Sequence, residues 1–135
     1  MTEDEIRVAA TEDLVVRFAE LGVEQYQCGE DEAWCVDEIA NDNPALLRYN
    51  RLYQEMATIS KELKARGPDA RRQLIPLYDH PNVQVRLQAA RFSYGVAREA
   101  ARKCIEKIAT SRLSYYRFDA GMTIEFLDDG TSMLD

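Results

Sequence analysis

The chain has 135 residues and a formal net charge of −7, with 46% apolar and 30% charged residues. This length suits one domain that buries roughly two-thirds of the surface its unfolded form would expose. No apolar run approaches the roughly 20 residues that a membrane-spanning helix requires, and the acidic start Met1-Thr-Glu-Asp-Glu is unlike a secretory signal. We therefore expect one cytoplasmic domain over residues 1–135, without a membrane partner.

Apolar residues recur at helical spacing soon after Thr11. Leu14, Phe18 and Leu21 follow one another at steps of four and three, and the acids after Thr11 suit the positive end of a helix dipole. The pattern predicts a helix from Thr11 to about Cys28-Gly29. A short acidic helix is expected over residues 33–39.

The longest regular pattern lies between Asn43-Pro44 and Gly67-Pro68. Asn43 is a good helix cap, proline fits the first helical position, and Gly67-Pro68 closes the segment. Between them an apolar stripe steps by four and three over about five turns, made of Ala45, Tyr49, Leu52, Met56, Ile59 and Leu63. The stripe predicts a long helix that packs against its neighbours.

Shorter helices are expected in the next segment. Residues 70–78 predict a helix that stops before Pro81, because a residue that precedes proline is pushed out of the α region. Asn82 is expected to cap a further helix, and Gly95 to end it in a left-handed conformation.

The last third of the chain is less regular. Residues 97–108 predict a helix with Cys104 in its apolar stripe. Beyond it we expect a short terminal helix capped by Asp119, or an irregular capping segment. Residues 129–135 are expected to form a flexible tail.

The segment over residues 74–90 resembles a HEAT repeat. It has a first helix, a turn that carries a proline, and a second helix with Val85, Arg86, Ala89 and Ala90 in the signature positions. The resemblance implies a helical hairpin with an adjoining helix over residues 70–108, in which Arg86 reaches back toward the turn. His80 stands where the usual repeat has an acidic residue.

The order of segments is also similar to DUF2019, a bacterial family of domains of unknown function. The resembling residues are 49–53, 62–67, the repeat over 74–90, and 119–123. The resemblance implies an all-α fold, an α-α superhelix of HEAT-like hairpins with about five to seven helices. It implies no activity and no catalytic residues.

Charge is distributed unevenly along the chain. Residues 1–42 carry 13 acids and 2 bases, residues 43–118 carry 15 bases and 6 acids, and residues 119–135 carry 5 acids and no base. Either the acidic ends pack on the basic middle, or the middle offers an exposed basic face to an acidic partner such as nucleic acid.

Few residues favour catalysis. His80 is the one histidine, and Cys28, Cys35 and Cys104 lack the spacing of a zinc or redox motif. We expect no catalytic, cofactor or metal site. We expect instead a non-enzymatic module for protein–protein interaction, with nucleic-acid binding through residues 43–118 as the alternative. The oligomeric state stays open, and so does the partner, either a toxin that an acidic, immunity-like surface inhibits or a chain that completes the stack. The candidate interaction surface comprises Arg48, Arg51, Arg86, Arg91, Arg98 and Arg102.

Overall fold

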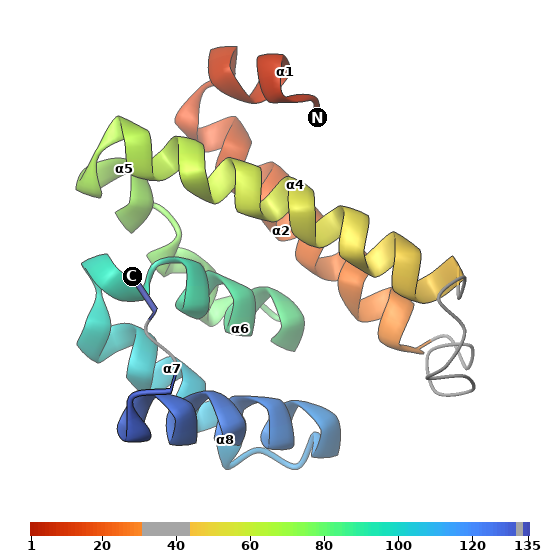
Figure 1. Ribbon diagram of the computed structural model, residues 1–135, viewed down its shortest axis with the longest axis vertical. Helices are drawn as coiled ribbons and strands as arrows, with labels where there is room; N and C mark the ends of the chain where they lie inside the picture. Colours follow the sequence, from red (N-terminus) through yellow and green to blue (C-terminus); the bar gives the residue numbers. More distant parts are fainter. Residues whose placement is uncertain (31–43, 132–133) are drawn as a thin grey trace.

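The computed structural model describes residues 1–30, 44–131 and 134–135, and within them every regular element is a helix (Figure 1). The prediction of an all-α fold is confirmed. The helix expected over residues 33–39 and the cap expected at Asn43 lie outside the described residues. The α-helices are α1 (Glu3–Val8), α2 (Thr11–Glu30), α4 (Pro44–Arg66), α5 (Pro68–Arg72), α6 (Val83–Phe92), α7 (Arg98–Ala109) and α8 (Ser114–Asp129), joined by the 3-10 helices η1 (Ile75–Asp79) and η2 (Tyr94–Val96).

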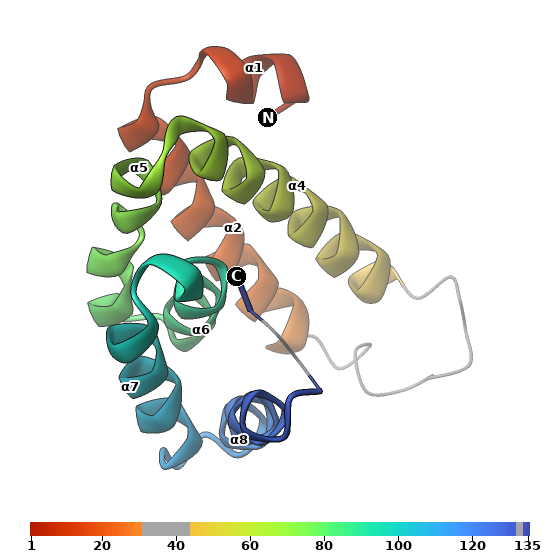
Figure 2. The ribbon, with the colours of Figure 1, turned by 60° about the vertical axis from the view of Figure 1, so that its left-hand side comes forward.

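The long helices are arranged around α6. Helix α2 packs along α4 and helix α7 packs along α8, while α6 lies between these two pairs and contacts both (Figure 1). Figure 2, in which α8 is seen end-on, shows the same order. Because both of its sides are covered, α6 buries seven of its ten residues.

Two apolar clusters meet at α6. The first contains Phe18, Leu21 and Met56, which are fully buried between α2 and α4, and it reaches Ala89 of α6. The second joins Leu87 and Ala90 of α6 to α7 and α8. Each side of α6 therefore has its own core. The five residues of α4 that are buried, Ala45, Leu52, Met56, Ile59 and Leu63, all belong to the predicted stripe.

Small residues bring α2 close to α6. A Cβ atom built on Gly22 would lie 2.7 Å from Cγ2 and 3.1 Å from Cα of Val85. Next to this crossing, buried Gln25 of α2 accepts hydrogen bonds through Oε1 from Nε2 of Gln84 at 2.9 Å and of Gln88 at 3.1 Å. The crossing thus combines close backbone packing with a buried polar link.

The segment that was expected to be one helix over residues 70–78 is divided into α5 and η1. Pro76 lies inside it, and proline has no N–H to donate and clashes with the carbonyl four residues earlier. Asn82 caps α6 as predicted, because its Oδ1 accepts from the amide of Gln84 at 2.9 Å. η1 and α6 pack together across the turn at Pro81, and the arrangement of the whole chain as a superhelix of HEAT-like hairpins stays a prediction.

Two predicted helix boundaries are wrong. α6 ends at Phe92, and Gly95 lies in η2 without a positive φ. Asp119 lies inside α8, which begins five residues earlier and runs to Asp129 before Gly130 ends it with φ of 80°. Neither residue is a helix cap: the Gly95 amide donates to Asp135, and Asp119 accepts from Arg91.

Helix α1 was not predicted, although its start carries a capping box. Thr2 Oγ1 accepts from the amide of Glu5, and the Glu5 carboxylate accepts from the amide of Thr2. Ile6 is 1% exposed, and Arg66 at the end of α4 donates to the carbonyl oxygens of Ile6 and Arg7, each at 3.1 Å. These contacts fix α1 across the end of α4. No helix in the described ranges has the length and apolar character that a membrane crossing requires.

Candidate functional site

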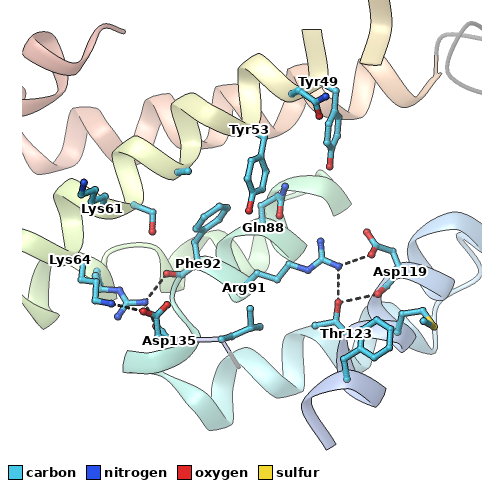
Figure 3. A pocket seen from close by; sticks show the side chains of 17 residues that line it. Tyr49, Tyr53, Lys61, Lys64, Gln88, Arg91, Phe92, Asp119, Thr123 and Asp135 are labelled. Atoms are coloured by element: carbon cyan, nitrogen blue, oxygen red, sulfur yellow. Dashed lines mark hydrogen bonds and ion pairs between the residues drawn. The ribbon is translucent and has the colours of Figure 1, made fainter. Parts of the chain in front are cut away.

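A groove of about 830 Å³ lies between α4, α6 and α8, and we call it the α4–α6–α8 groove (Figure 3). It forms because α6, the helix between the two pairs, has α4 and α8 on opposite sides of the partly exposed edge that carries Arg91 and Phe92. The last two residues of the chain, Leu134 and Asp135, also line it. Its principal side chains are Tyr49, Tyr53, Lys61, Lys64, Arg71, Gln88, Arg91, Phe92, Asp119, Thr123 and Asp135.

One wall of the groove is aromatic. The rings of Tyr53 and Phe92 lie 5.7 Å apart, and Phe92 in turn packs edge-on against buried Phe18 at 5.6 Å. Tyr53 is 41% exposed. An aromatic surface that is supported from behind and open in front suits contact with the apolar part of a ligand.

Arg71 gives the groove a buried positive charge. Its side chain is 8% exposed, and one terminal nitrogen donates to the carbonyl oxygens of Phe92, at 3.0 Å, and of Asp135. Within the described ranges no side-chain carboxylate forms an ion pair with it, and its buried Nε has no hydrogen-bond partner. A buried polar group is ordinarily hydrogen-bonded, so Arg71 keeps one donor that a ligand in the groove could satisfy.

Asp135 occupies the Arg71 end of the groove. Lys64 Nζ donates to its Oδ2 at 2.5 Å, and the amide of Gly95 donates to its carbonyl oxygen at 3.2 Å. The hydrogen bond from Lys64 lowers the pKa of the Asp135 carboxyl below its usual range. Residues from α4, α5 and η2 thus hold one acidic residue.

The opposite end of the groove has a neutralised charge. Arg91 of α6 donates to Asp119 Oδ1 and to Thr123 Oγ1, both at 2.7 Å and both on α8 (Figure 3). This contact ties α6 to α8. The other cations that line the groove are therefore Lys61, Arg71 and Lys64, and Lys64 pairs with Asp135.

The six predicted arginines do not converge on one surface. Arg91 alone among them lines the groove, and Arg86 donates to the carbonyl oxygens of His80, at 2.8 Å, and Pro81, as its resemblance to a repeat arginine implied. Arg51 and Arg98 are exposed on different helices. Three of the six pair with the acidic ends of the chain: Arg48 with Glu24 at 3.6 Å, Arg91 with Asp119 at 2.7 Å, and Arg102 with Asp128 at 2.9 Å.

The predicted surface does not include Lys61, Lys64, Arg71 or Asp135, which all line the groove. The signal for the lysines is the second stripe of α4, in which positions 53, 57, 60, 61 and 64 share one helix face. No sequence signal brings Asp135 to that face.

Groups with chemical reactivity lie elsewhere and serve the fold. His80 Nδ1 accepts from the amide of Asn82 at 3.0 Å and so stabilises the turn before α6. Burial raises the pKa of the Cys104 thiol, which makes it a poor nucleophile. In the part of the chain that the structure describes, no group of three or more His, Cys, Asp or Glu side chains is placed to hold a metal ion. The groove therefore offers cationic side chains beside an aromatic wall.

Comparison with known proteins gives a fold relative and a family. The crystal structure of the protein RPA1889 from Rhodopseudomonas palustris CGA009 is similar to this chain with a TM-score of 0.82 and 38% sequence identity, over 96% of this chain and 98% of that one. No curated protein matches. The family model described as a domain of unknown function (DUF2019) matches residues 12–128. The chain therefore belongs to the DUF2019 family.

Proposed function

We propose that the chain is a non-enzymatic, cytoplasmic module for protein–protein interaction, which binds an acidic segment of its partner in the α4–α6–α8 groove. The observation that carries this proposal is Arg71, a residue with 8% exposure at the end of the groove, whose Nε has no hydrogen-bond partner and which no described side-chain carboxylate pairs. A carboxylate of the partner would accept from Nε. Charge-assisted hydrogen bonds of this kind are about twice as strong as neutral ones.

The rest of the groove supports a peptide ligand. Lys61 and Lys64 add two positive charges beside Arg71, and the Tyr53–Phe92 wall offers apolar contact along the groove. A segment with acidic and apolar side chains fits both features. Stacked helical hairpins commonly present such a groove to a partner protein, which agrees with the HEAT-like character proposed for residues 70–108.

The charge pattern favours protein over nucleic acid. Binding to a phosphate backbone benefits from a continuous basic surface, whereas half of the six candidate arginines are paired with Glu24, Asp119 or Asp128. In the groove, the cations that no α8 carboxylate pairs form one short patch of Lys61, Lys64 and Arg71. Such a patch suits a few carboxylates better than a long polyanion.

The proposal is tested by placing a photo-crosslinking residue in the groove at Ser60 and irradiating cells of the native host. A control variant carries the crosslinker at Val16, an exposed position of α2 outside the groove. We expect a defined protein adduct from position 60 that disappears when Lys61→Glu and Lys64→Glu are added, and that does not form from position 16.

Two outcomes contradict the proposal. An adduct that nuclease digests and protease leaves intact would mean that the groove binds nucleic acid. An adduct pattern identical at positions 60 and 16, or unchanged by the two charge reversals, would mean that the groove has no partner of the proposed kind.

A further inference from the structure

Leu134 and Asp135 lie in the groove as a ligand would. Asp135 receives hydrogen bonds from three separate elements: Lys64 on its carboxylate, and Arg71 and the amide of Gly95 on its carbonyl oxygen. Leu134 lines the same groove beside it. The groove therefore contacts both a side-chain acceptor and a main-chain acceptor of the same residue.

Gly95 makes room for this contact. A Cβ atom built on Gly95 would lie 2.3 Å from the carbonyl oxygen and 2.4 Å from the carbonyl carbon of Asp135, which is closer than real Cβ atoms approach other atoms. Gly95 has no positive φ, so backbone conformation does not require glycine here. The absence of a side chain is required by the approach of a second main chain, as a peptide-binding site demands.

We propose that the groove recognises a peptide in which an acidic residue follows an apolar one, and that Leu134 and Asp135 of the chain itself occupy this site until such a segment of a partner protein displaces them. The inference rests on the proposed function and deepens it. The partner presents an apolar residue followed by an acidic one, and Leu134 and Asp135 compete with this pair for the groove.

The contact between Lys64 and Asp135 is weak enough for a partner to displace it. The side chain of Lys64 is 55% exposed and that of Asp135 is 87% exposed, and ion pairs that are this open to water contribute little. The buried part of the site, Arg71, donates to main-chain oxygens of Phe92 and Asp135, and its Nε stays without a partner. A partner whose carboxylate reaches Arg71 satisfies groups that Asp135 leaves unsatisfied, and so it binds better.

The test measures the binding of a fluorescein-labelled peptide with the sequence of residues 131–135, Thr-Ser-Met-Leu-Asp, whose C-terminus is amidated so that only the side-chain carboxylate is offered. Fluorescence anisotropy compares the full chain with the full chain carrying Leu134→Gly and Asp135→Gly. We expect the variant to bind at least roughly fivefold more tightly, because removal of a competitor restores the fraction of empty sites.

Two controls identify the site. The peptide Thr-Ser-Met-Leu-Asn is expected to bind the emptied variant more weakly than the acidic peptide. Gly95→Val in the emptied variant is expected to abolish binding while the circular dichroism spectrum and the melting temperature stay close to those of its parent. In ¹H–¹⁵N spectra, the Gly95 amide and the Arg71 Nε resonances are expected to shift on titration with the acidic peptide.

Equal affinity of the full chain and the emptied variant would overturn the inference, and so would equal affinity for the acidic and amide peptides. If neither protein binds the peptide while the groove-specific protein adduct from Ser60 is still formed, this inference fails and the proposed function stands. If both experiments fail, both proposals are wrong.

Discussion

The two sides of α6 are packed in different ways. On the side of α2 and α4 the core is built from large side chains with no exposure, such as Phe18, Leu21 and Met56. On the side of α7 and α8 smaller residues such as Ala90, Ala101 and Cys104 accompany Leu87 and Ile105. Helix α8 contributes Ala120 as its one fully buried residue among those described.

The comparison explains where the groove comes from. Large side chains draw α2 and α4 into a tight pair, whereas α8 is held mainly by partly buried contacts and by the link from Arg91 to Asp119. α8 therefore lies beside α6 without covering it, and the exposed edge of α6 stays open toward α4. We therefore expect the α2–α4 side to determine most of the free energy of unfolding, and the α7–α8 side to determine the shape of the groove.

The largest expected effect that tests this difference comes from removing a large side chain from the core between α2 and α4. Phe18→Ala removes a fully buried ring that packs edge-on against Phe92, and we expect a loss of about 3–5 kcal/mol in the free energy of unfolding. The matched change on the second side is Ile124→Ala in α8, a partly buried residue, with an expected loss of about 1 kcal/mol. Urea unfolding followed by circular dichroism measures both. Equal losses would show that the two cores contribute alike.

A pair of glycines tests the same contrast at the level of the backbone. Gly22→Ala places a methyl group 2.7 Å from Val85 Cγ2 and 3.1 Å from its Cα, and overpacking of this kind costs about 1–3 kcal/mol. Gly121→Ala in α8 meets nothing within 4 Å, so it should stabilise by about 0.5–1 kcal/mol through the better helix propensity of alanine. Thermal unfolding should therefore shift in opposite directions. A stabilising Gly22→Ala would mean that α2 and α6 can separate without loss.

The helices could be predicted from sequence where local pattern and packing agree. The stripe of α4 lies on one helix face, so each residue's burial follows from the spacing of its neighbours. Asn82 likewise makes its cap with residues two and three positions away. The division into α5 and η1 does not follow from apolar spacing, because it depends on Pro76 within the segment.

The groove could not be predicted in the same way. Lys64 and Asp135 are 71 positions apart, and Arg71 and Asp135 are 64 apart. These residues meet only through the packing of several helices around α6, which no local pattern specifies. In the sequence Arg71 is one of fifteen bases in the middle segment, and only the fold shows that it is buried. Gly95 was predicted to end a helix, whereas in the structure it makes room for the main chain of Asp135.

Charge pairing on the first side gives a pH-dependent prediction. Burial by itself would raise the pKa of Glu55, but hydrogen bonds and charge from Arg17, at 2.6 Å, and from the Met1 amine outweigh it, so the pKa is lowered from 4.5. A lowered carboxylate pKa stabilises the fold above pH 4.5, and this stabilisation is lost as the pH falls through the folded-state value. Glu55→Gln should therefore cost about 1–2 kcal/mol at pH 7 and progressively less as the pH is lowered below 4.5. The difference between the urea midpoints of the parent protein and the Glu55→Gln variant measures this cost, and a difference that does not shrink on acidification would contradict the assignment to Glu55.

The smallest effects are expected from the arginines that pair with α8. Arg91 and Asp119 are 22% and 31% exposed and share Thr123, so Arg91→Ala should cost about 0.5–1 kcal/mol, near the upper end for surface pairs. Arg102 pairs with Glu106 and Asp128 in the open, where water and salt screen the charges, and Arg102→Ala should leave the melting temperature unchanged within error. The two variants remove the same charge from neighbouring helices, so each controls for the other.

Since Arg91 joins α6 to α8 at the edge of the groove, its loss should also weaken peptide binding, whereas loss of Arg102 should not. A larger melting-temperature change for Arg102→Ala than for Arg91→Ala would mean that α8 is held by its outer charges rather than by its contact with α6.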